Sequence, residues 1–350
     1  MSDSWRTNLR HRADDETIVA AKQAVTIFFS STENFYVNPD LDGFLSAAVL
    51  KSVLSWNPVG IAACNGTTED SLWTTVATGR ELEAVFVDIW IHPQNIKVID
   101  QHITAYDEVH HAELAKNSLK VNPNLLWPRM LRGAGSRAYQ WKYPFGVVHF
   151  IIAALESLGH VIDIEESAVL GFSNLDLLLR ADDAARTTSA NYRPNALCWW
   201  DFLVRLGGPV TRMLADHAIH TPMARVSSRQ TSAEQHLAQL LRPVGRGTRD
   251  GGVAALIRQA GTWTPEMQRY IDSLLNDAFS GPTSIGFGDP LRRVSLSGKR
   301  TYPGNPVVPY LLKDSELFAY AFTTGVRDTP YGDGFSYTTR RKPDENNRQG

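Results

Sequence analysis

Residues 34–56, NFYVNPDLDGFLSAAVLKSVLSW, decide the fold class of this chain. The aromatic and β-branched residues at 34–38 predict a short strand, and the small and apolar residues after Gly43 predict a helix. Only a few residues join the two, among them Asp40 and Asp42, and Gly43 offers the backbone freedom that a tight turn needs. The stretch therefore predicts a strand, a turn and a helix in immediate succession.

The sequence on either side of this stretch alternates apolar runs with helical or loop segments. The pattern at 13–29, ADDETIVAAKQAVTIFF, predicts a helix with carboxylates in its first turn. Three continuous apolar runs follow the central stretch: VGIAAC at 59–64, AVFVDIWI at 84–91 and KVID at 97–100. Such runs predict a parallel sheet that is buried on both faces. We therefore expect an α/β domain with a parallel sheet and helices on both of its faces.

The rest of the chain predicts further helices and then a second, smaller sheet. The segments 144–160 and 166–184 have apolar residues at helical spacing. Four short runs near the C-terminus, separated by Gly, Pro and Asp, predict an antiparallel sheet: RRVSLSG, NPVVPYLL, ELFAYAFTTG and GFSYTT. We expect a first domain at 1–185, a helical connector at 186–260 with a linker at 244–252, an α+β region at 261–339, and a disordered tail at 340–350.

The composition excludes several classes of protein. With 43% hydrophobic and 21% charged residues, the chain falls in the ordinary globular range. No run approaches the roughly 20 apolar residues of a membrane span, and the start MSDSWRTNLRHR lacks the apolar core of a signal peptide. Cys64 and Cys198 form no Cys-x-x-Cys pair, which excludes thiolate metal sites and redox motifs. We therefore expect a soluble, cytoplasmic protein with no membrane partner.

The net charge of −2 conceals an uneven distribution of charge along the chain. Residues 1–185 hold 14 Lys and Arg against 23 Asp and Glu, which leaves 21 against 14 for residues 186–350. An acidic half suits cations and a basic half suits phosphates, although uneven surface charge without function gives the same pattern.

Carboxylates fall where the predicted strands end. Asp40 and Asp42 follow the first strand, Asp88 lies late in the third, and Asp100 ends the fourth. Ligands of parallel α/β sheets collect at the carboxyl ends of the strands, so we expect these side chains to share one site. Phosphodiester cleavage uses two divalent cations roughly 3.5–4 Å apart, and carboxylates with a few imidazoles suit Mn²⁺ or Mg²⁺.

Three motifs in this order resemble the DHH superfamily, which includes RecJ-like nucleases and nucleotide phosphodiesterases. NPDLDGFLSA resembles its first motif, VFVDIW its second, and VIDQHI the Asp-His-His motif that gives the family its name. The resemblance covers residues 34 to about 185, and the combination is more specific than any one motif. It implies a metal-dependent hydrolase that acts on phosphoric ester bonds.

The resemblance implies a role for each residue that matches a motif. Asp40 would bind the first of two Mn²⁺ or Mg²⁺ ions, Asp42 would bind the second, and Asp88 would bridge them. In the third motif, His102 would contact the substrate phosphate, and Asp100 would orient the site. These five residues form the expected centre.

The chain departs from the family pattern at two positions. Where relatives have a metal-binding His or Asp it has Asn38, and where they have the first His of Asp-His-His it has Gln101. Both amides can offer a carbonyl oxygen to hard Mg²⁺ or Mn²⁺, so we retain them as metal ligands and favour a working enzyme. We assign the aspartate of a fourth motif to Asp176, with Asp182 and Asp183 as alternatives.

Basic residues are the candidates for substrate binding. Lys142 precedes a predicted helix, and Arg292, Arg293 and Arg300 flank a predicted C-terminal strand. Four aromatic residues near that strand predict a stacking surface: Tyr302, Tyr320, Phe335 and Tyr337. Arginine mixed with aromatic residues suits single-stranded nucleic acid or a small nucleotide, which we expect as substrate. The Gly-Gly-Gly-His run common in the C-terminal domains of the family is absent.

Two other classes of function remain open. A catalytically degenerate DHH-like module would bind nucleic acid, a nucleotide signal or a protein partner, as a homodimer or within a complex. Two metal ions bound between Asp40, Asp42 and Asp88 would indicate the enzyme, and a site that stays empty in Mn²⁺ would indicate the module. A phosphatase would use Asp40 as a covalent nucleophile, and trapping with beryllofluoride would reveal it.

Overall fold

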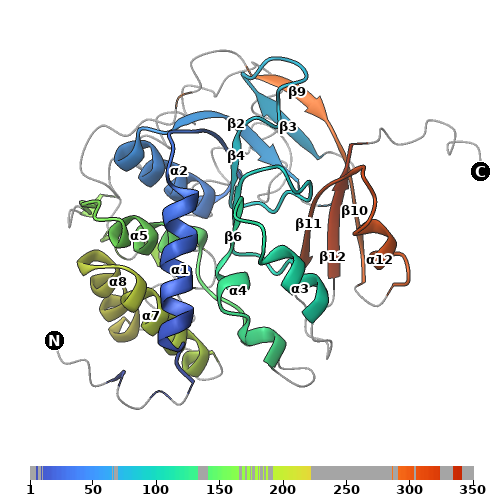
Figure 1. Ribbon diagram of the computed structural model, residues 1–350. Helices are drawn as coiled ribbons and strands as arrows, with labels where there is room; N and C mark the ends of the chain where they lie inside the picture. Colours follow the sequence, from blue (N-terminus) through green and yellow to red (C-terminus); the bar gives the residue numbers. More distant parts are fainter. Residues whose placement is uncertain are drawn as a thin grey trace, which may run out of the picture.

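A seven-stranded sheet organises the computed structural model of the protein, with its strands in the order β6-β5-β4-β1-β2-β3-β9. Figure 1 labels β6, β4, β2, β3 and β9 of this sheet. The structure describes residues 11–64, 70–132, 141–164, 192–221, 291–302, 305–323 and 334–340, together with scattered residues outside these ranges.

Five neighbouring strands of this sheet run parallel: β6 (Lys120–Val121), β5 (Val98–Ile99), β4 (Val85–Val87), β1 (Asn34–Val37) and β2 (Asn57–Ala63). The predicted α/β class is therefore confirmed. The remaining two strands, β3 (Ser71–Thr74) and β9 (Arg292–Ser295), are antiparallel to their neighbours and correct the expectation of a parallel sheet. The short 64–70 connection explains β3, because a parallel partner for β2 would need a long crossover.

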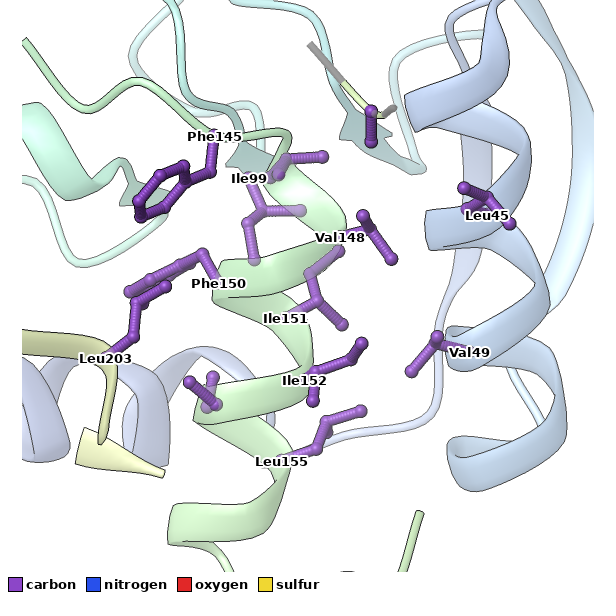
Figure 2. Close-up of a cluster of buried hydrophobic side chains, with 14 of the residues drawn as sticks. Leu45, Val49, Ile99, Phe145, Val148, Phe150, Ile151, Ile152, Leu155 and Leu203 are labelled. Carbon is purple, nitrogen blue, oxygen red and sulfur yellow. The ribbon is translucent and has the colours of Figure 1, made fainter. Parts of the chain in front are cut away.

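Helices cover one face of the sheet. The layer consists of α1 (Asp15–Phe28), α2 (Leu41–Leu54) and α5 (Val147–Ser157), with α7 (Arg193–Leu206) and α8 (Pro209–His220) packed in the same core. Figure 2 shows Val148 and Ile152 of α5 directed toward Leu45 and Val49 of α2. Among the described residues, no helix is long and apolar enough to cross a membrane.

The opposite face corrects the expectation of helices on both sides. A three-stranded antiparallel sheet packs there, in the order β10 (Ser297–Thr301), β12 (Gly334–Thr339) and β11 (Leu317–Thr323). Phe86 of β4 lies 5.9 Å from Phe318 of β11 between ring centres, and Ile103 forms a backbone bridge with Phe322. The short helices α3 (Glu108–Leu114) and α12 (Val308–Leu311) complete this layer. Large aromatic side chains on β11 fill the space that a second helical layer would fill.

Three local predictions for the chain beyond residue 165 are wrong. NPVVPYLL forms the helix α12, where Pro309 lies in the first turn, a position that proline tolerates. RRVSLSG divides at Leu296 between β9 of the large sheet and β10 of the small one. Within 166–184, a hairpin of β7 (Ala168–Val169) and β8 (Phe172–Ser173) stands where helix was expected.

The remaining described elements are the short helix α4 (Pro123–Leu126) and the 3₁₀ helix η2 (Arg129–Arg132).

The domain boundaries stay predictions. The linker at 244–252 and residues 341–350 of the tail lie outside the described residues.

Glu156 of α5 holds the start of α8. Its carboxylate accepts the main-chain N–H groups of Gly208, Val210 and Thr211 at 2.7–2.9 Å, and the Thr211 hydroxyl at 2.6 Å. Glu156→Ala should lower the free energy of unfolding by about 2 kcal/mol, because several donors of the helix N-terminus lose their acceptor. Urea denaturation measures this loss of unfolding free energy. Glu156→Gln should lose less, and an unchanged midpoint in Glu156→Ala would contradict the role.

Candidate functional site

The candidate site lies where the order of the strands reverses. From β1 the chain passes through α2 to β2 on one side, whereas β4 joins β1 on the other side. In an open α/β sheet, this reversal leaves a crevice at the carboxyl ends of the two central strands. Asn38 and Asp88 are the first residues beyond β1 and β4, so they stand at this crevice.

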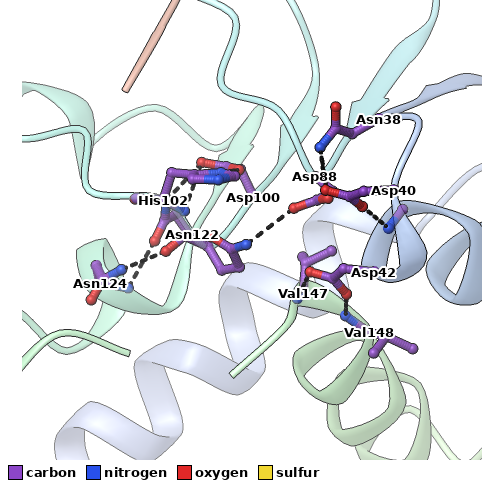
Figure 3. Close-up of polar contacts among 12 residues, drawn as sticks. Asn38, Asp40, Asp42, Asp88, Asp100, His102, Asn122, Asn124, Val147 and Val148 are labelled. Carbon is purple, nitrogen blue, oxygen red and sulfur yellow. Dashed lines mark hydrogen bonds and ion pairs between the residues drawn. The ribbon is translucent and has the colours of Figure 1, made fainter. Parts of the chain in front are cut away.

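Strand register places four polar residues in one row along the carboxyl edge. The last residues of four of the five parallel strands, β1, β4, β5 and β6, are partners: Val37 with Val87, Val87 with Ile99, and Ile99 with Val121. The next residue of each strand is polar, and three backbone bonds of 2.9–3.2 Å extend the ladder through them. The row, much of which Figure 3 shows, is Asn38, Asp88, Asp100 and Asn122.

Asp88 is the most confined of the carboxylates. It is 1% exposed, and its φ of 61° is a left-handed conformation that aspartate tolerates better than most residues. Burial raises the pKa of Asp88 well above its usual range, and the charges of Asp40, Asp42 and Asp100 raise it further. A proton on Asp88 relieves this repulsion, and a divalent cation would do the same.

Asp40 and Asp42 both hold helix N-termini. Asp40 caps α2, where its Oδ1 accepts the Gly43 N–H at 2.9 Å. Asp42 is buried, and its two oxygens accept the N–H groups of Val147 and Val148 at 2.6 and 3.0 Å, which anchors the first turn of α5. Both carboxylates thus lie beside the row and also fix the two helices around it.

Gly43 is required for a reason other than the one expected from the sequence. It lies inside α2 and has no positive φ, so it does not serve as a flexible turn residue. A Cβ atom at this position would lie 2.2 Å from the carbonyl oxygen of Asn38 and 2.9 Å from a methyl group of Val37. Glycine therefore allows the first turn of α2 to approach the end of β1.

The two amides at the departures from the family pattern face Asp88. The Nδ2 of Asn38 donates to Oδ2 of Asp40 at 2.7 Å and to Oδ2 of Asp88 at 3.2 Å. The Nε2 of Gln101 donates to Oδ1 of Asp88 at 3.1 Å. Both amides therefore act as hydrogen-bond donors, and the expectation that they offer carbonyl oxygens does not describe this arrangement.

Asp100 and His102 form a pair beside Asp88. The Nδ1 of His102 lies 2.7 Å from Oδ1 of Asp100, and the His102 main-chain N–H donates to the other oxygen at 3.0 Å. Asp100 is fully buried, whereas the His102 side chain is 38% exposed. A buried carboxylate that orients an accessible imidazole is an arrangement suited to proton transfer.

Asn122 and Asn124 support this pair and were not predicted. The Asn122 amide donates to the carbonyl of His102 at 2.9 Å, and the Asn124 amide donates to the carbonyl of Gln101 at 2.8 Å. The signal available in the sequence was the run Lys-Val-Asn-Pro-Asn, in which an Asn cap and proline follow a short strand.

Three side chains of the site fit a divalent ion. Asp88, Asp100 and His102 each offer one ligand atom, and the three atoms lie within 4.8 Å of one another. Two carboxylates with one imidazole suit Mn²⁺, and the exposed side of His102 leaves space for water or a phosphate oxygen. The candidates for the fourth motif lie outside the described residues: Asp176, Asp182 and Asp183.

A cavity of about 100 Å³ opens beside these residues. Its lining includes Asn38, Asp88 and His102, together with Arg300 of β10 and Ser336 of β12. An arginine in the same cavity as carboxylates can bind a phosphate that also contacts a metal ion.

The other predicted basic residues lie away from this cavity. Arg292 pairs with Glu81, and the Arg293 guanidinium lies 5.9 Å from the centre of a Trp73 ring. Lys142 precedes α5, and none of these three basic residues is in the described cavity wall. The structure therefore brings Arg300, but not the other three, to the candidate centre.

The predicted aromatic stacking surface is largely part of the core. Tyr320 and Phe335 are buried, and the Tyr320 hydroxyl donates to the carbonyl of Thr104 at 3.1 Å. Tyr337 stacks on Phe335. Tyr302 is 58% exposed and remains available for stacking.

Lys120 of β6 predicts a pH dependence of stability. Burial lowers its pKa to about 7, against the opposing charge of Asp100, and its ammonium donates to the carbonyl of Ile91. An unfolded lysine has a pKa of about 10.4, so between roughly pH 7 and 10 the unfolded chain binds one more proton than the folded chain. The free energy of unfolding should therefore gain up to about 1.4 kcal/mol per pH unit from Lys120 across this window. Urea denaturation at pH 7, 8 and 9 should show this slope reduced in Lys120→Met, and equal slopes would contradict it.

Comparison with protein-family models, with curated proteins and with solved structures finds no match to this chain.

Proposed function

We propose that this protein is a metal-dependent phosphoesterase of the DHH type. The observation that carries the proposal is the cluster of Asp88, Asp100 and His102 at the carboxyl edge of the sheet, beside the reversal of strand order. The motif resemblance supports the same reading, because all three residues belong to its second and third motifs. The reaction would be hydrolysis of a phosphodiester or phosphomonoester bond.

The residues of the site would have different roles in this reaction. A Mn²⁺ or Mg²⁺ ion held by Asp88, Asp100 and His102 would polarise the phosphate and acidify a bound water. The contact of Nδ1 with Asp100 would orient the His102 ring for binding the ion. Arg300, which also lines the cavity, would hold a non-bridging phosphate oxygen.

The size of the cavity favours a substrate that inserts only its phosphate. About 100 Å³ is well below the roughly 300 Å³ at which pockets begin to enclose a whole small molecule. The rest of the substrate would lie outside, where Tyr302 is exposed next to the basic strand β10. Single-stranded nucleic acid or a small nucleotide fits this description.

Arg300→Ala should lower kcat/KM for Mn²⁺-dependent hydrolysis by about 10²-fold, because the phosphate loses a charged donor in a confined site. Arg300→Lys should recover only part of the loss, since an ammonium cannot form a bidentate contact. The assay uses bis(p-nitrophenyl) phosphate, a single-stranded DNA and a single-stranded RNA oligonucleotide, and cyclic dinucleotides.

Arg293→Ala is the matched control, because this arginine lies over Trp73 and outside the described cavity wall. It should keep the wild-type rate. If Arg300→Ala kept the wild-type activity, Arg300 would not bind the substrate phosphate. If the wild type turned over none of these substrates, the proposed hydrolase activity would be wrong.

A non-catalytic binding module is the second candidate, and one observation favours it. The amides of Asn38 and Gln101 satisfy both oxygens of Asp88 without any cation. Such a module would bind oligonucleotides in EDTA as tightly as in Mn²⁺ and would leave them intact. Fluorescence anisotropy under both conditions separates the two candidates.

A further inference from the structure

We infer that this protein binds one divalent ion rather than the pair expected from its motifs, and that the amide nitrogen of Asn38 takes the place of the second. The inference rests on the proposed function, which supplies the first ion. The second ion is here the one that Asp40 and Asp88 would share, on the side of Asp88 away from the cluster with Asp100 and His102.

The Asn38 amide joins the two carboxylates that a second ion would join. Its Nδ2 lies 2.7 Å from Oδ2 of Asp40 and 3.2 Å from Oδ2 of Asp88. Figure 3 shows this nitrogen directed toward Asp88 and the amide oxygen directed away from it. An amide nitrogen donates two hydrogen bonds and has no lone pair for a metal, so in this orientation Asn38 cannot be a ligand.

Gln101 makes the same kind of contact from the other side. Its Nε2 donates to Oδ1 of Asp88 at 3.1 Å, and its main-chain carbonyl is held by Asn124 at 2.8 Å. Both oxygens of Asp88 therefore accept an amide N–H. The partial positive charges of these N–H groups partly offset the negative charge that a second cation would neutralise.

Asp42, the other aspartate that the motif resemblance assigns to metal binding, holds a helix N-terminus instead. Asp42 uses both oxygens to accept the N–H groups of Val147 and Val148 at 2.6 and 3.0 Å. Turning this carboxylate toward a metal would leave two buried donors of the α5 N-terminus without an acceptor. The second ion would thus lose a ligand and destabilise a helix that packs in the core.

The arguments from Asn38 and Asp42 against the second ion do not apply to an ion held by Asp88, Asp100 and His102. Asp100 and His102 bond to each other, Asp100 also accepts the Asn122 amide at 3.3 Å, and His102 is open to the cavity. An ion bound there would compete with the Gln101 amide for Oδ1 of Asp88 but would leave the Asn38 bridge in place. The chain therefore retains ligands for one ion and amide donors in place of the other.

The test measures Mn²⁺ per chain by equilibrium dialysis and metal analysis, with electron paramagnetic resonance of the same samples. The wild type should bind one Mn²⁺ and give the six-line spectrum of an isolated ion. Asn38→Asp should bind two ions with an exchange-coupled spectrum, since paired ions lie roughly 3.5–4 Å apart. Asn38→His is an independent second variant, also expected to gain an ion, in case Asn38→Asp fails to fold without metal.

Asn57→Asp is the matched control, because it makes the same charge change at the amino end of β2, where Asn57 bonds to Asn34. It should bind one ion. Two coupled ions in the wild type would overturn the inference and leave the proposed function intact. No bound ion in the wild type would overturn the proposed function itself. A single ion in both folded site variants would show that the Asn38 amide does not exclude the second ion.

Discussion

Asp88→Asn should leave the protein folded and lower its Mn²⁺-dependent kcat/KM by at least about 10³-fold, a loss typical of removing a residue essential to the reacting centre. The substitution removes a charged ligand from the cluster with Asp100 and His102. Dialysis should show the corresponding loss of bound Mn²⁺.

The fold should tolerate this change for two reasons. The raised pKa of Asp88 favours a proton on this carboxyl, and asparagine has nearly the same shape as a protonated aspartate. Asparagine also tolerates the φ of 61° at this position. In EDTA near neutral pH, the Tm of Asp88→Asn should therefore stay close to that of the wild type, because relief of the carboxylate repulsion offsets the loss of one of the two amide hydrogen bonds that Asp88 accepts.

The exposed Asp163 provides a matched control for Asp88→Asn. Asp163→Asn should keep the activity and the bound Mn²⁺ of the wild type. If Asp88→Asn retained full activity, the assignment of the centre to this edge of the sheet would be wrong. A large fall in Tm in EDTA would contradict the charge argument instead.

Gly43→Ala should lower the free energy of unfolding by at least about 3 kcal/mol and abolish activity as well. The new methyl group would lie 2.2 Å from the carbonyl oxygen of Asn38, which is backbone and cannot rotate away. The gain of about 1 kcal/mol in helix propensity from Gly to Ala is too small to compensate. Relief requires α2 to shift, and the shift displaces the aspartates at its start, Asp40 and Asp42.

Gly79→Ala is the control for Gly43→Ala. Gly79 has a φ of 87°, and a Cβ atom added there would meet no atom within 4 Å, so its cost should be the roughly 1–2 kcal/mol of a left-handed residue. Chemical denaturation and circular dichroism measure both variants. Equal stability of Gly43→Ala and the wild type would contradict the close approach of α2 to β1.

Much of the first half of the fold could be predicted because local signals and tertiary packing agree there. The segment 34–56 contains a strand, an Asp cap and a helix, and β1 and α2 form from them. The apolar runs predicted a sheet buried on both faces, which is what the structure has. Placing Asp88 and Asp100 on one edge followed from the parallel direction of the strands.

The remaining features of the site depend on contacts between distant parts of the chain. Asp42 caps a helix that begins about a hundred residues later, and no local pattern indicates that partner. Arg300 reaches the cavity because β10 pairs with β12. The sequence also could not show that the amides of Asn38 and Gln101 act as donors, because amide orientation depends on the surrounding hydrogen bonds.

The second half was harder to predict because its short apolar runs suit either helix or strand. NPVVPYLL has the residues of a strand, yet two prolines deprive it of main-chain donors and it becomes α12. The β-strand β6 spans two residues, too few for a periodic signal, so the row position of Asn122 was missed.

The most direct test of the central claim is an anomalous difference map from crystals of the protein grown with Mn²⁺. The proposed centre predicts a strong peak among the side chains of Asp88, Asp100 and His102. A map with no peak at these residues at saturating Mn²⁺ would contradict it.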